Sequence, residues 1–133
     1  MSTNTLNDFE CILLIDDDAL SNQLSKNHLR NIGYLNEIII FERSLDGFDY
    51  VKAKTKKNNP IKCSVLIFID INMPILDGWG FLERFDSFEE HEKEIFRIIV
   101  MASSHDPKDI KKAYKDKNVS GYMAKPLSVH FKG

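Results

Sequence analysis

The stretch SVLIFIDINMPILDGWGF, residues 64–81, contains an apolar run that ends on an acidic side chain. Val65–Ile69 has the length and the unbroken apolar character of a strand buried on both faces of a sheet. Asp70 follows directly, and Asn72, a proline and two glycines come after it, which is typical of a loop. A carboxylate at the end of a buried strand needs a physical reason, and the rest of the chain offers one.

Apolar runs alternate with segments of helical period along the chain. The predicted strands are 11–15, 37–41, 65–69, 97–102 and 120–125, and the predicted helical segments are 19–33, 44–58, 78–88 and 107–117. This alternation is typical of βα units around a parallel sheet.

Apolar side chains recur at helical spacing in the predicted helical segments. The faces that we expect to point inward contain Leu20, Leu24, His28 or Leu29, and Ile32 in the first helix, and Trp79, Leu82 and Phe85 in the third. The charged run at 89–94 is expected to be a solvated loop or helix end.

Composition limits the possible functions. A chain of 133 residues, 43% hydrophobic and 29% charged, is expected to form one globular domain. A net charge of −2 argues against a nucleic-acid binder. No apolar run approaches the roughly 20 residues of a membrane span, and the N-terminus has no secretory pattern, so we expect a cytoplasmic protein without a membrane partner.

Polar residues follow four of the predicted strands, and the carboxyl ends of parallel strands share one edge of a sheet. The residues at these strand ends are Asp16, Asp17 and Asp18, then Asp70, then Ala102 with the hydroxyl residues Ser103 and Ser104, and finally Lys125. Two carboxylates about 4 Å apart repel by roughly 4 kcal/mol at an effective dielectric of about 20, so such a cluster requires cations. Lys125 supplies one, and the oxygen ligands favour Mg²⁺ as the second. Asp18 is expected to cap the first helix instead.

Four motifs occur in order at these strand ends: LLIDDD (13–18), FIDINMPILDGWGF (68–81), small and hydroxyl residues after the fourth strand, and GYMAKPL (121–127). Together they resemble the receiver domain of two-component response regulators, over about residues 9–128. The resemblance implies an α/β fold, a flavodoxin-like doubly wound five-stranded parallel sheet. Residues 1–8 would then be an N-terminal tail and 129–133 a C-terminal remnant.

The resemblance also implies a role for each matching residue. Asp70 would accept a phosphoryl group, Asp16, Asp17, Asp70 and the backbone carbonyl of Asn72 would hold Mg²⁺, Lys125 would pair with the phosphoryl oxygens, and Tyr122 would be the aromatic switch residue. The implied phosphodonor is a sensor histidine kinase or a histidine phosphotransfer protein, and the output is a contact with a downstream protein that the sequence does not name.

The sequence departs from the family pattern at two places. The family has a Thr or Ser at the end of the fourth strand, and counting along the chain places either Ala102 or Ser103 there. After Pro126 only LSVHFKG remains, so the last helix is expected to be shortened or missing. Apolar sheet surface near the first and fifth strands would then be uncovered, which predicts a homodimer or a longer native chain.

Other functions fit the residues less well. A phosphatase with a strand-end Asp nucleophile needs a second Asp two residues later, where this chain has Asn72. An FMN carrier would need a phosphate-binding loop where three aspartates stand. The main alternative is a degenerate receiver that acts as a phosphorylation-independent interaction module, since Ala102 has no hydroxyl.

Overall fold

The computed structural model describes residues 6–57, 61–103 and 106–127. In this part of the chain a short 3-10 helix, η1 (Leu6–Asp8), precedes the strands and helices. The strands are β1 (Cys11–Ile15), β2 (Glu37–Phe41), β3 (Val65–Asp70), β4 (Phe96–Ala102) and β5 (Val119–Ala124). The helices are α1 (Ala19–Asn31), α2 (Ser44–Thr55), α3 (Gly78–Asp86), α4 (Glu90–Lys93) and α5 (Pro107–Lys115).

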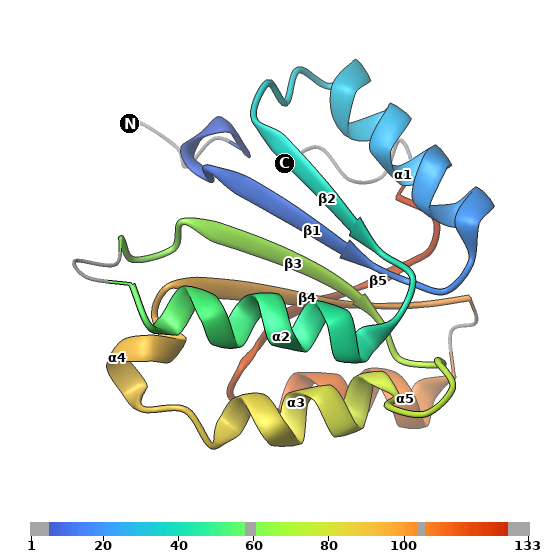
Figure 1. The fold of residues 1–133 in the computed structure, drawn as a ribbon. Helices are drawn as coiled ribbons and strands as arrows, with labels where there is room; N and C mark the ends of the chain where they lie inside the picture. The colour runs from blue at the N-terminus through green and yellow to red at the C-terminus, as the bar shows by residue number, and fades with distance from the viewer. Residues whose placement is uncertain (1–5, 58–60, 104–105, 128–133) are drawn as a thin grey trace.

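The five strands form one parallel sheet in the order β2-β1-β3-β4-β5. Helices α2, α3 and α5 cover one face of the sheet and α1 covers the other (Figure 1). This is the flavodoxin-like doubly wound α/β fold that the sequence predicts, and each predicted strand agrees with the structure to within one residue. The charged run at 89–94 contains the single helical turn α4.

The core lies on both sides of the central strands. Every residue of β1 and β3 is buried, which explains their unbroken apolar character. Alternate side chains of these strands point to opposite faces of the sheet and form two core clusters. One cluster includes Phe81, Leu82 and Phe85 of α3, and the other includes Leu29 of α1. The predicted inward face of α3 is therefore confirmed, with Trp79 half-buried beside it.

The predicted inward face of α1 is wrong. Its buried residues are Ser21, Asn22, Ser25 and Leu29, whereas Leu20 is 68% exposed and Leu24 is 44% exposed. Ile32, just beyond the helix, is exposed, and His28 is half-buried, so Leu29 alone of the predicted set is buried. The polar side chains point inward because they bond to backbone: Asn22 donates to the carbonyl of Asp16, and Ser25 accepts from the N–H of Leu127.

No helix follows β5 within the described residues, which end at Leu127, in keeping with the expectation of a shortened or missing last helix. The expected remnant at 129–133 lies outside them. The uncovered apolar surface expected near the first strand is not found, because β1 is buried along its whole length, while β5 is half-buried. None of the described helices combines the length and apolar character that crossing a bilayer requires.

Candidate functional site

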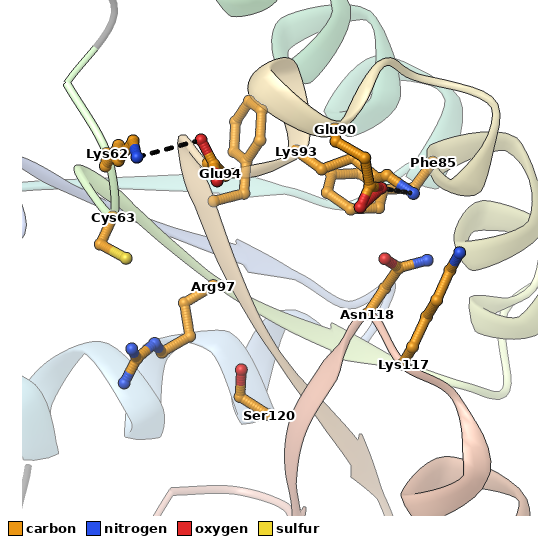
Figure 2. A pocket seen from close by; sticks show the side chains of 11 residues that line it. Lys62, Cys63, Phe85, Glu90, Lys93, Glu94, Arg97, Lys117, Asn118 and Ser120 are labelled. Atoms are coloured by element: carbon orange, nitrogen blue, oxygen red, sulfur yellow. Dashed lines mark ion pairs between the residues drawn. The ribbon is translucent and has the colours of Figure 1, made fainter.

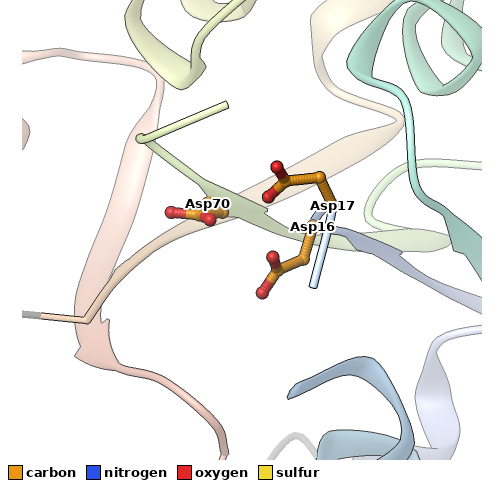
Figure 3. Close-up of side chains that lie close together, drawn as sticks. All are labelled: Asp16, Asp17 and Asp70. Atoms are coloured by element: carbon orange, nitrogen blue, oxygen red, sulfur yellow. The ribbon is translucent and has the colours of Figure 1, made fainter. Parts of the chain in front are cut away.

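The carboxyl ends of β1 and β3 bring three aspartates together. Ile15 pairs with Ile69 in adjacent parallel strands, so Asp16 and Asp70 follow at the same level of the sheet. Their side chains are 0% and 2% exposed, whereas Asp17 is exposed. Carboxylate oxygens of the three residues lie within 4.8 Å of one another (Figure 3). This acidic triad is the cluster that the strand-end pattern predicts.

Lys125 enters the triad from the end of β5. Its backbone N–H donates to the carbonyl of Ala102 at 3.0 Å, which holds the residue beside the last residue of β4. Its ammonium nitrogen Nζ lies 2.9 Å from Asp70 Oδ2 and 3.0 Å from both oxygens of Asp16. The side chain is 12% exposed. One ammonium thus pairs with two buried carboxylates, which leaves the site with excess negative charge.

Burial sets the protonation behaviour of this site. It raises the pKa of the Asp70 carboxyl above its ordinary value, while hydrogen bonds from Lys125 and from the Asn72 N–H oppose this shift. For Lys125 burial acts to lower the pKa, but the hydrogen bonds to Asp70 and Asp16 leave the ammonium pKa raised. Lys125 therefore stays charged and stabilises the ionised form of Asp70.

The donor set of the triad fits a divalent cation. Asp16 Oδ2 is buried and accepts no hydrogen bond, and the Lys125 ammonium 3.0 Å away is its one ion-pair partner among the described residues. An ionised oxygen that is removed from water without full compensation is costly, and a cation would compensate it. The ligand atoms are carboxylate oxygens, which hard cations such as Mg²⁺ and Mn²⁺ prefer. The acidic triad could hold such a metal.

Asn72 lies next to the triad. Its backbone N–H donates to Asp70 Oδ1 at 3.0 Å, so the two oxygens of Asp70 have separate partners, Asn72 for Oδ1 and Lys125 for Oδ2. These bonds fix the rotation of the carboxylate. The predicted use of the Asn72 carbonyl as a metal ligand stays a prediction.

The two candidates for the hydroxyl position differ in exposure. Asp70 of β3 pairs with Met101 of β4. Ala102 and Ser103 are the next two residues along the chain, so both lie just beyond the position beside Asp70. Ala102 ends β4 and is fully buried, whereas Ser103 is exposed.

Tyr122 is half-buried on β5, opposite Val100, and packs against the larger core cluster. Its pKa is raised by burial and by the charges of Asp109 and Asp106 on the α5 side.

Asp18 caps a helix instead of joining the acidic triad, as the sequence predicts. Its side chain accepts hydrogen bonds from the N–H groups of Leu20 and Ser21, at 3.0 and 3.1 Å, and so caps α1.

Two supporting residues were not assigned from the sequence. Asn22 donates to the carbonyl of Asp16 at 2.7 Å and so fixes the end of β1 against α1. Gly78 begins α3 where a Cβ atom would lie 2.6 Å from Ile71 Cα and 2.9 Å from the Asp70 carbonyl oxygen. The sequence predicts a glycine-containing loop here, but the close approach depends on how α3 returns to the sheet.

Comparison with known proteins agrees with this geometry. The family model of the response regulator receiver domain matches residues 12–130, and the chain belongs to this family. It is thus a signalling domain of two-component type.

The chain is also similar to solved structures and to part of a larger kinase. A two component response regulator from Cytophaga hutchinsonii has 28% identity and a TM-score of 0.81, over 92% of this chain and 90% of that one. The Mn(2+)-bound form of response regulator Rcp1 has 22% identity and a TM-score of 0.69, over 91% of this chain and 84% of that one. The peroxide stress-activated histidine kinase mak1 of Schizosaccharomyces pombe is 25% identical over 119 residues, which are 89% of this chain but only 7% of the kinase.

Proposed function

We propose that this receiver domain takes a phosphoryl group onto Asp70 and signals through a protein contact. The observation that carries the proposal is the placement of Asp70, which is buried within an acidic triad and paired at 2.9 Å with a lysine from another strand end. A structural carboxylate would need neither the second buried aspartate nor the Asp16 oxygen that accepts no hydrogen bond. The donor is a sensor histidine kinase or a histidine phosphotransfer protein, which implies a cytoplasmic location.

The residues of the site divide the chemistry of phosphoryl transfer among them. An oxygen of Asp70 forms a bond to phosphorus while the phosphorus–nitrogen bond of the donor histidine breaks and its electron pair returns to the imidazole. The Asn72 N–H holds the Asp70 carboxylate in one rotation, and Lys125 stands ready to pair with the phosphoryl oxygens. Such transfer depends mainly on positioning and on positive charge, both of which this arrangement provides.

Mg²⁺ is the proposed metal, held by Asp16, Asp17, Asp70 and the carbonyl of Asn72. When bound, it would supply the second positive charge opposite the phosphoryl oxygens. The Mn(2+)-bound relative supports a divalent ion in this fold. The proposed response involves Tyr122, with the phosphoryl oxygens finding donors in Lys125, backbone N–H groups or Ser103, because the methyl group of Ala102 cannot donate.

The test is the intact mass of the protein after incubation with acetyl phosphate and Mg²⁺. One phosphoryl group should add, and EDTA or Asp70→Asn should abolish the addition. Asp77→Asn is the matched control, since Asp77 caps α3 outside the triad and should leave phosphorylation intact.

A wild-type protein that gains no mass would instead favour the phosphorylation-independent interaction module. Phosphorylated samples of Ala102→Thr and Ser103→Ala, compared by NMR at Tyr122, would locate the switch position. We expect the threonine to enlarge the Tyr122 shift and the Ser103 change to matter little; the reverse result would place the switch at Ser103.

A further inference from the structure

A second candidate site lies at the opposite edge of the sheet from the acidic triad. A pocket of about 350 Å³ opens beside the amino ends of β4 and β5, where Arg97 and Ser120 are the second residues of their strands (Figure 2). The segment before β3 contributes Cys63, and α3 contributes Phe85. This volume lies within the range of pockets that bind small molecules.

Most charges around the pocket are already paired. Lys62 lies 3.4 Å from Glu94, and Lys93 lies 2.8 Å from Glu90 (Figure 2). Behind this wall Asp86 accepts from Asn118 at 2.9 Å and lies 3.1 Å from Lys93 and 3.7 Å from Lys117. The Lys93 side chain is only 10% exposed, so this lining residue is held within the folded structure.

Arg97 is the exception. Within the described part of the chain its guanidinium forms no hydrogen bond, ion pair or ring contact. The pocket is lined by four positively charged side chains, and the nearby negative charges are those of Glu90, Glu94 and Asp86. One positive charge is therefore in excess. Figure 2 shows the guanidinium extending away from both ion pairs of the wall. The unmatched charge therefore belongs to Arg97.

The strand beside Arg97 is also irregular. Ile98 pairs with Val119 and Ile99 pairs with Gly121, so Ser120 is an extra residue that forms a β-bulge. Bulges re-aim side chains and occur preferentially beside functional sites. The Ser120 hydroxyl is exposed and lines the same pocket as Arg97. It adds a neutral hydrogen-bond donor to the unmatched guanidinium.

We propose that this pocket binds a small organic anion whose carboxylate or phosphate group pairs with Arg97 and Ser120. A planar guanidinium with no internal partner can engage either group through two parallel hydrogen bonds. The net single positive charge matches one anionic group, and the rest of the pocket volume is available to the body of the ligand. This site is independent of phosphorylation at Asp70.

The proposal is tested by NMR titration of the isotope-labelled chain with inorganic phosphate and, separately, with benzoate. Ionic strength is held constant, and EDTA keeps metal away from the acidic triad. Saturable shifts are expected at the Arg97 side-chain N–H and at the amides of Cys63 and Ser120. Arg97→Gln should weaken binding about tenfold or more, because a charge-assisted hydrogen-bonded pair is lost. Arg84→Gln removes the same charge from an exposed position on α3 outside the pocket and should leave affinity unchanged.

Cys63 provides a second readout. It is exposed at the pocket, whereas Cys11 is buried, so the neutral reagent iodoacetamide should modify Cys63 first, and a bound anion should slow that reaction. Protection by only one of the two anions would support the proposal and assign the ligand as a phosphate or a carboxylate. Equal affinity in wild type and Arg97→Gln, or shifts confined to residues around Asp70, would overturn it.

Discussion

Helices α1 and α3 carry apolar residues at the same helical spacing but use them in opposite ways. Helix α3 buries Phe81, Leu82 and Phe85 against the sheet. Helix α1 exposes Leu20 and Leu24 and buries a face that is mostly polar. Apolar spacing therefore identifies a helix, but hydrogen bonds to the ends of the strands decide which face of α1 turns inward.

The largest expected effect tests this difference in packing. Phe85→Ala should lower the free energy of unfolding by about 3–5 kcal/mol, because it removes a buried ring that contacts Phe88 and Phe96. Leu24→Ala, at an apolar position of α1, should change it by no more than about 0.5 kcal/mol. Urea unfolding of both variants measures the contrast, and comparable losses would show that α1 packs through its leucines after all.

A smaller effect should follow from the polar face of α1. Asn22→Leu leaves the buried carbonyl of Asp16 without its donor and should cost about 1–3 kcal/mol, even though leucine is the more apolar residue. Gln23→Leu is the matched control, since Gln23 is exposed and bonds only to Asn27 on the same helix. Urea unfolding again gives the measurement; a neutral or stabilising Asn22→Leu would mean that the bond does not fix α1.

The smallest effect concerns the exposed polar contacts at the end of α3. Hydrogen bonds from Asn118 and Lys93, together with the charge of Lys117, hold the pKa of Asp86 below its ordinary value. The ionised carboxylate therefore stabilises the fold above the ordinary pKa, and this contribution disappears as pH falls through the lower folded-state pKa.

Asp86→Asn should accordingly lower the melting temperature slightly at neutral pH, and the difference from wild type should shrink in acid. Glu83→Gln, on the same helix but without an ion pair in the described structure, should show no such trend. A difference that is constant from neutral to acidic pH would rule out the electrostatic explanation.

The strands and the acidic triad could be predicted because each depends on local pattern and on one topological rule. Buried parallel strands read as apolar runs, and their carboxyl ends must meet at one edge, which places Asp16 beside Asp70. The inward face of α1 could not be predicted in this way, since Asn22 and Ser25 are buried by bonds to backbone far along the chain. The pocket at Arg97 could not be predicted either, because it depends on a β-bulge that no residue in the sequence indicates.

The close approach at Gly78 has a mechanical consequence. No side chain separates the first residue of α3 from the backbone at Asp70 and Ile71, and the Gly78 N–H donates to the Ile71 carbonyl at 3.1 Å. The carboxyl end of β3 and the first turn of α3 are thus in direct backbone contact. A displacement of the backbone at Asp70 would therefore act directly on the first turn of α3.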